Sequence, residues 1–294
     1  MSKLSGHWTF SLVALFAATS MVVAGTEAFA AGKNKLDIVK NSEYDPNAEQ
    51  VELFNAMEDG KVESKLVLKD SKGGRLLVTN NTQQPLSVSM PKAMVGVQVL
   101  KQLGGLGGQS GGQGGFGSGG QAQSTGGGIN GGTGGNTGGL GGNSGGSLFS
   151  IPASKTLSLD FNSVCLEHGK AEPASRMEYT VAPVATFSED PVLERLLVNV
   201  AEQRIDNHVA QAAAWHLASE MSWGDLAAKS VKHLGGLPAT SYFSRAQLSK
   251  AQQAVSVLTF RVQQEAEENK NNSESEEVSE TPEPAPADRV SLAR

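Results

Sequence analysis

The sequence has one cysteine, no excess of positive charge and no recognisable catalytic or metal-binding pattern, and each shortage excludes a class of protein. The lone Cys165 among 294 residues cannot form a disulfide framework within the chain, so stability has to come from buried apolar side chains. Lys and Arg (24) are outnumbered by Asp and Glu (30), which gives a net charge of −6. Without a basic stripe to neutralise phosphates, the protein is not expected to bind nucleic acid.

The histidines and glycines do not form a metal or nucleotide motif. His168, His208, His216 and His233 lack H-E-x-x-H or Cys/His spacing, and a structural zinc site needs four ligands. A G-x-G-x-x-G match at 112–117 falls in a segment so rich in glycine that chance explains it, and no strand precedes it and no helix follows it. We therefore expect no metal and no cofactor.

Residues 1–30 have the composition of a secretory signal peptide. Lys3 precedes an apolar run over 8–25, and an A-x-A cleavage site ends at Ala30. Cleavage there would place the mature chain in the periplasm, cell envelope or exterior without a stable membrane span. The alternative is an uncleaved membrane anchor, for which the run is slightly short of the roughly 20 residues that a span needs.

A glycine-rich run at 104–146 divides the remaining chain. Of its 43 residues 24 are glycine and none is charged, so we expect it to be disordered. The segment before the run, 31–103, contains four predicted strands, and the segment after it, 147–184, is too short to fold alone, which favours a loop inserted into one domain. Lengthening a hairpin loop this far costs only about 2 kcal/mol, so one domain can contain such a loop. A scaffold role predicts that deletion of 104–146 leaves the melting temperature nearly unchanged.

Both flanking segments alternate apolar and polar residues, which is typical of β-strands. The eight predicted strands are 62–69, 75–79, 86–90, 94–100, 148–151, 156–161, 164–166 and 177–181. A helix is predicted before them at 46–58, where Asp45 and Pro46 form an N-cap signal. The fold prediction is therefore α+β: an antiparallel β-sandwich with a long Gly-rich loop insertion, followed by a small helical subdomain.

The helical subdomain is predicted over 188–268. Its four helices are marked by N-cap residues, among them Asp190, Ser222 and Ser244, and the last helix is long. The apolar 3-4 spacing of that helix favours packing against the domain, with self-association as the alternative. Residues 269–294, rich in acidic residues and proline, are predicted to be a disordered acidic tail.

Two short segments carry a resemblance to known families. VCLEHG at 164–169 and QAAAWHL at 211–217 resemble uncharacterised exported bacterial proteins that have the same runs. They also resemble bacterial thioester adhesion domains, in which a Cys thiol and a Gln side chain form an internal thioester that captures host amines. That resemblance implies a Cys165–Gln211 thioester; possible neighbours are His168, Trp215 and His216. A buried structural thiol, and a helix face that packs on the sheet, explain the same residues without chemistry.

The expected function is that of an exported, non-catalytic binding or scaffold protein whose partner is an unidentified protein or envelope component. The ligand and the oligomeric state do not follow from the sequence. Covalent adhesion through Cys165 and Gln211 is the alternative hypothesis. A third is a hydrolase whose site the sequence does not display.

Overall fold

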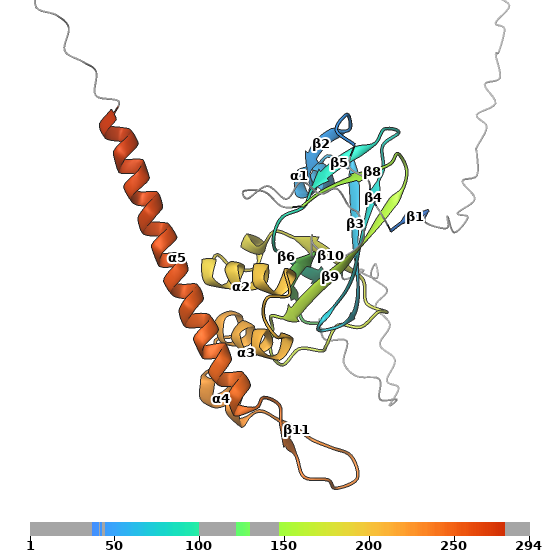
Figure 1. Cartoon of the computed structure of the whole chain (residues 1–294). Helices are drawn as coiled ribbons and strands as arrows, with labels where there is room; N and C mark the ends of the chain where they lie inside the picture. The colour runs from blue at the N-terminus through green and yellow to red at the C-terminus, as the bar shows by residue number, and fades with distance from the viewer. Residues whose placement is uncertain (1–36, 41, 43–44, 100–121, 130–146, 280–294) are drawn as a thin grey trace, which may run out of the picture. The chain divides into compact units, whose positions relative to one another are not determined.

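The computed structural model describes residues 37–40, 42, 45–99, 122–129 and 147–279, with side chains as far as residue 271. The predicted signal peptide and the last part of the predicted tail lie outside these residues. Within them the chain is a mixed α+β protein whose strands are mostly antiparallel, as predicted (Figure 1).

Six strands form a closed antiparallel barrel, where the sequence predicted a two-layer sandwich. In ring order the strands are β9 (Thr156–Cys165), β4 (Gly73–Asn80), β3 (Val62–Asp70), β10 (Tyr179–Ala182), β6 (Met94–Gln98) and β7 (Thr125–Ile129), and β7 pairs back onto β9. Closure depends on the length of β9, which pairs with β4 over 156–162 and with β7 over 161–165. The separate strand predicted at 164–166 is therefore the end of β9. β1 (Ile38–Val39) pairs in parallel with the start of β9.

The glycine-rich run supplies β7, so the prediction of disorder over 104–146 is wrong for residues 122–129. All five residues of β7 are buried. A Cβ on Gly127 would lie 1.9 Å from the carbonyl oxygen of Asn162 in β9. Glycine is needed here because the neighbouring backbone occupies the place of a side chain. The rest of the run lies outside the described residues.

A three-stranded sheet and a short helix pack over the barrel core. β5 (Leu86–Ser89) lies between β2 (Glu49–Glu52), which is parallel to it, and β8 (Leu148–Ile151), which is antiparallel. Helix α1 (Leu53–Glu58) follows β2, and its buried Leu53 belongs to the same apolar cluster as Leu66 inside the barrel. The helix predicted at 46–58 is wrong in its first half: Asp45 accepts a hydrogen bond from Asn47 N–H within a turn, and Glu52 caps α1.

Four α-helices follow the barrel, as predicted. They are α2 (Pro191–Ala201), α3 (Asn207–Ala218), α4 (Trp223–Ala228) and α5 (Arg245–Ser279), preceded by the 3-10 turn η1 (Val184–Thr186). The predicted capping residues Asp190, Ser222 and Ser244 each accept a hydrogen bond from a backbone N–H of the first turn. The cap of α3 is Asp206, whose side chain accepts from the backbone N–H groups of His208 and Val209.

Helix α5 is longer than expected. It continues to Ser279, so the prediction of disorder from residue 269 is wrong for 269–279. This segment has no proline before Pro282 to stop the helix. Near its start, the buried Leu248, Ala251 and Leu258 pack into the domain, as the sequence favoured.

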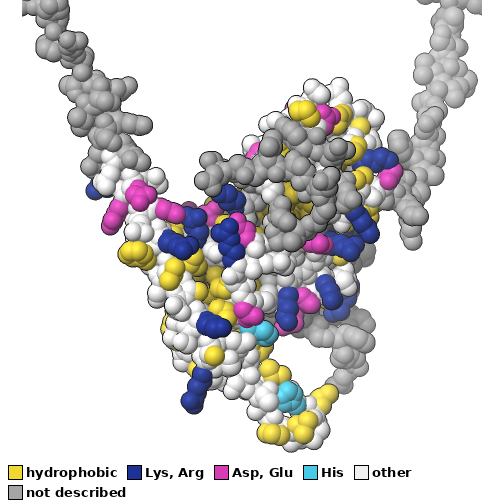
Figure 2. Space-filling model, in the orientation of Figure 1, with side chains coloured by type: hydrophobic (Ala, Val, Ile, Leu, Met, Phe, Trp, Pro, Cys, Tyr) yellow, Lys and Arg dark blue, Asp and Glu magenta, His cyan; other side chains and the backbone are white. Residues whose placement is uncertain are grey.

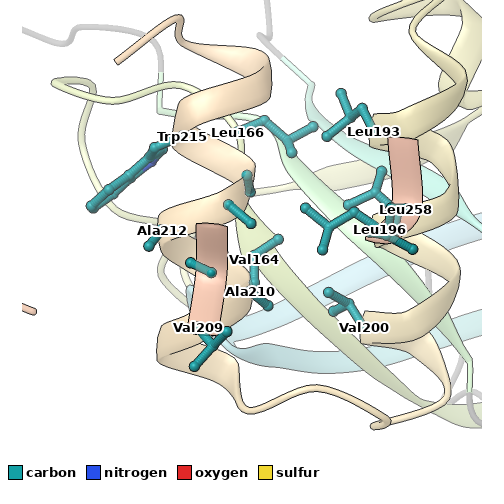
Figure 3. Packing of buried hydrophobic residues seen from close by; sticks show 14 of the residues in the cluster. Val164, Leu166, Leu193, Leu196, Val200, Val209, Ala210, Ala212, Trp215 and Leu258 are labelled. Atoms are coloured by element: carbon teal, nitrogen blue, oxygen red, sulfur yellow. The ribbon is translucent and has the colours of Figure 1, made fainter. Parts of the chain in front are cut away.

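The helices and the outer wall of the barrel share a second apolar core. In Figure 3, Val164 of β9 and Leu166 just after it lie between Leu193 and Leu196 of α2 and the small residues of α3. Helix α2 also crosses β7, where a Cβ on Gly126 would lie 2.6 Å from both methyl carbons of Leu197. The barrel and the helices therefore stabilise each other through β7 and the end of β9.

Candidate functional site

Beyond Asn162 strand β9 no longer pairs with β4, and side chains of α3 cover its free edge. The side chains come from a stripe at four-residue spacing, one above the other on a helix face: Asn207, Gln211, Trp215 and Ser219. Asn207 Nδ2 donates to Ser163 O at 3.1 Å, and Ser219 Oγ donates to Leu166 O at 2.7 Å. These polar side chains satisfy backbone groups that a further strand would otherwise have to satisfy.

Gln211 forms the centre of this contact. Its Oε1 accepts from the backbone N–H of Cys165 at 2.9 Å, and its Nε2 donates to Cys165 O at 2.7 Å. Gln211 is 5% exposed and Cys165 is 1% exposed, so this pair of hydrogen bonds is buried. The structure thus brings the two residues of the thioester hypothesis together, and the hydrogen bonds that join them use the backbone of Cys165.

The thiol of Cys165 lies on the other face of the strand. Side chains alternate along a strand, and the neighbouring Val164 and Leu166 face the helices, so Cys165 faces the barrel interior. Burial raises the pKa of the thiol to about 12; Glu172 and Asp70 add to the rise, and a hydrogen bond with Ser71 opposes it. A thiol with this pKa is protonated at neutral pH and is a poor nucleophile.

Just after the strand, four side chains form what we call the aromatic–cation cluster: His168, Trp215, Lys229 and Tyr242. The ring of His168 meets Trp215 edge-on at 4.9 Å between centroids, and the rings of Trp215 and Tyr242 lie 5.6 Å apart. Lys229 Nζ lies 5.0 Å from the centroid of Trp215 and 5.1 Å from that of Tyr242, within the range of cation–π attraction. It also donates to His168 Nε2 at 2.8 Å.

The cluster is held in place by the backbone around it. His168 N–H donates to Ser219 Oγ at 2.9 Å, which joins the end of the polar stripe to the loop after β9. Tyr242 N–H donates to Lys229 O at 2.9 Å across the base of the next hairpin. Burial, and then the charge of Lys229, lower the pKa of His168 below its ordinary value. The imidazole is therefore neutral at neutral pH, and its Nε2 accepts a hydrogen bond from the ammonium group of Lys229.

The sequence singled out some of these residues and missed others. His168 and Trp215, named from the sequence as possible neighbours of Cys165 and Gln211, contact each other just after the strand. His216 does not join them through its ring: it donates from Nδ1 to Met221 O at 2.8 Å and packs on Trp223 at 4.2 Å between centroids. Lys229 and Tyr242 carried no local signal, because only the packing of α4 and the following hairpin brings them to Trp215.

Between Lys229 and Tyr242 the chain forms a hairpin that extends away from the cluster. It consists of β11 (Ser230–Val231), β12 (Thr240–Ser241) and the turn between them. Leu234 is 96% exposed and Leu237 is 65% exposed, and Figure 2 shows hydrophobic side chains gathered at this tip. Because contiguous exposed apolar patches can mark contact surfaces, this tip is a candidate for one.

Comparisons of the chain with models of protein families, with curated proteins and with solved structures each found no match. Among the described residues, no three potential metal ligands lie together. In the same part of the chain, none of the helices has the length and apolar content to cross a membrane.

Proposed function

We propose that the protein is an exported, non-catalytic binding protein of the cell envelope or exterior, and that it docks through the end formed by the aromatic–cation cluster and the β11–β12 hairpin. The observation that carries the proposal is the position of Lys229. Its ammonium group is fixed against His168 and over two aromatic rings, directly at the base of a hairpin with exposed leucines. Aromatic side chains beside an apolar tip are a combination found at binding surfaces.

Four groups at this end that could take part in acid–base or nucleophilic chemistry, Lys229, His168, Cys165 and Gln211, are each hydrogen-bonded or buried. Lys229 donates to the neutral imidazole of His168, and the thiol of Cys165 is buried with a raised pKa. The amide of Gln211 is used by the backbone of β9. These arrangements favour a preorganised surface over a reactive centre.

Site-specific photo-crosslinking in the exporting host tests the proposal. A photoreactive phenylalanine derivative replaces Leu234 at the hairpin tip or, as a control, the exposed Lys65 on β3. We expect crosslinked products with envelope material from position 234 and none from position 65. Equal yields at both positions, or no product from either, would contradict docking through this end.

Covalent adhesion through an internal thioester is the second candidate function, because the fold brings Cys165 and Gln211 together from positions 46 residues apart. The thiol would displace ammonia from the Gln211 amide, and the buried pair of backbone hydrogen bonds would be lost. Intact mass decides: a chain short by one ammonia, with the full mass restored in Cys165→Ala, supports the thioester. A mass equal to that of the processed sequence, together with a free Cys165 thiol, excludes the thioester.

A further inference from the structure

The tip of the β11–β12 hairpin has no packing partner among the described residues. Gly235 and Gly236 have φ of 78° and 75°, which turns the chain sharply between Leu234 and Leu237. A Cβ placed on either glycine would meet no atom within 4 Å, so the tip stands clear of the rest of the described chain. The two leucines therefore project together from a narrow finger.

The chain that forms this finger and the first part of α5 carries basic side chains and no acidic ones. At its base, burial and then the charge of Glu172 raise the pKa of Tyr242, so one carboxylate from outside this segment lies near. The segment 226–264 has no Asp or Glu, although the whole chain has a net charge of −6. Its five basic residues are Lys229, Lys232, Arg245, Lys250 and Arg261. Lys232 in the hairpin, and Arg245 and Lys250 in the first turns of α5, are exposed. The carboxylate of Asp225, just before this segment, accepts hydrogen bonds from the backbone N–H and the hydroxyl of Ser222 in the cap of α4.

We infer that the hairpin inserts its leucine tip into an anionic lipid surface. The proposal rests on docking through this end of the molecule and names the partner. Leucine side chains that project from a finger fit the boundary between headgroups and acyl chains, and the Lys and Arg residues behind them fit anionic headgroups. A protein partner would need a pocket for two leucines together with an acidic rim, whereas an anionic bilayer presents both features everywhere.

Co-sedimentation of the exported full chain with lipid vesicles tests the inference. The vesicles contain phosphatidylcholine alone or phosphatidylcholine with phosphatidylglycerol. The variant Leu234→Ser/Leu237→Ser removes the tip, and Val257→Ser/Phe260→Ser is the matched control, because these two α5 residues are 43% and 60% exposed outside the hairpin. All variants share one N-terminus, so any contribution from that region cancels, and thermal unfolding shows that each is folded.

We expect binding to the phosphatidylglycerol vesicles that weakens as salt is raised. The tip variant should bind about tenfold to a hundredfold more weakly, because two buried leucines are lost. The α5 control should bind as the natural chain does. Lys232→Glu/Arg245→Glu should weaken binding by about tenfold or more while the leucines remain. A tryptophan in place of Leu234 should shift its emission to the blue when vesicles are added.

Three outcomes would overturn the inference: no binding to either vesicle, equal binding to both lipid compositions, or equal loss in the tip variant and the α5 control. If vesicles fail but position 234 crosslinks to an envelope protein, the hairpin binds protein and the proposed function stands. If position 234 crosslinks to nothing and vesicles also fail, both proposals are wrong.

Discussion

At the scale of single residues, Gln211 is the most informative position. Gln211→Leu keeps the volume but leaves the backbone N–H and C=O of Cys165 buried without partners. Each such group costs about 1–3 kcal/mol, so we expect a loss of about 2–4 kcal/mol in the free energy of unfolding. Denaturant unfolding measures it.

Cys165→Ala is the matched control for that variant. It removes one sulfur atom from the barrel interior and keeps both backbone hydrogen bonds, so we expect a loss of about 1 kcal/mol. If the thiol, rather than the backbone of Cys165, makes the stabilising contact with Gln211, Cys165→Ala would lose more free energy of unfolding than Gln211→Leu. That result would make the thioester the first candidate function.

His168 provides a prediction about pH. Burial, and then Lys229, hold the pKa of His168 below 6.5 in the folded chain. The unfolded chain then binds more protons than the folded chain as pH falls through about 6.5, so stability decreases there instead of increasing. In Lys229→Met the second cause is removed, so the pKa should rise towards 6.5. Histidine NMR titration of the natural chain and the variant measures both values, and an unchanged pKa would show that the contact with Lys229 is not formed in solution.

The sequence supported a part of this site. Gln211 and Trp215 were expected on one helix face, and the same spacing extends back to Asn207 and forward to Ser219. Three polar residues at this spacing in an alanine-rich helix, Asn207, Gln211 and Ser219, are the signal that could have indicated a backbone edge opposite. The sequence could not predict that this edge belongs to β9. The edge is free because β9 stops pairing with β4 after Asn162, and no local sequence pattern indicates where that pairing ends.

At the scale of elements, β7 explains the main error of sequence-based prediction. Its five residues, Thr125–Ile129, include three glycines and sit within a run of similar composition on both sides. Low apolar content usually means that a segment cannot offset its ordering entropy. Here the close fit replaces side-chain burial, because strand β9 and helix α2 pack directly on the glycine backbone. Prediction from periodicity depends on alternating side chains, so it cannot detect a strand whose three central residues are glycines.

Gly127→Ala tests this explanation. The new Cβ would lie 1.9 Å from Asn162 O, which is a backbone atom and cannot turn away. We expect a loss of about 2–4 kcal/mol, seen as a fall of about 5–15 °C in the melting temperature. Gly224→Ala in α4 is the control, since its Cβ would have 3.6 Å to the nearest atom, and it should be neutral or stabilising by up to about 1 kcal/mol. Equal effects of the two changes would mean that β7 is not packed as described.

At the scale of the whole molecule, the strands and helices were largely predictable and their closure was not. The alternation over 62–69 and 156–161 gave the positions of β3 and the first half of β9, and the capping residues gave the starts of α2, α4 and α5. Without β7, these strands have two free edges, and a sandwich is the natural arrangement for them. One additional strand joins β6 to β9 and closes the ring.

The same closure changes what deletions within the glycine-rich run should do. Removal of 104–146 takes β7 out of the barrel, so the near-neutral effect expected from the sequence is replaced by a large fall in melting temperature or by loss of folding. Removal of 104–118 and 134–143 keeps residues 122–129 and shortens the two connections of β7. Shorter connections change the closure free energy by less than about 1 kcal/mol each, so this variant should melt within a few degrees of the natural chain. Circular dichroism melting of the natural chain and the two deletion variants distinguishes the cases. If both deletions leave the melting temperature equally unchanged, β7 does not close the barrel. If both lower it equally, the connections contribute to the fold beyond holding β7 in place.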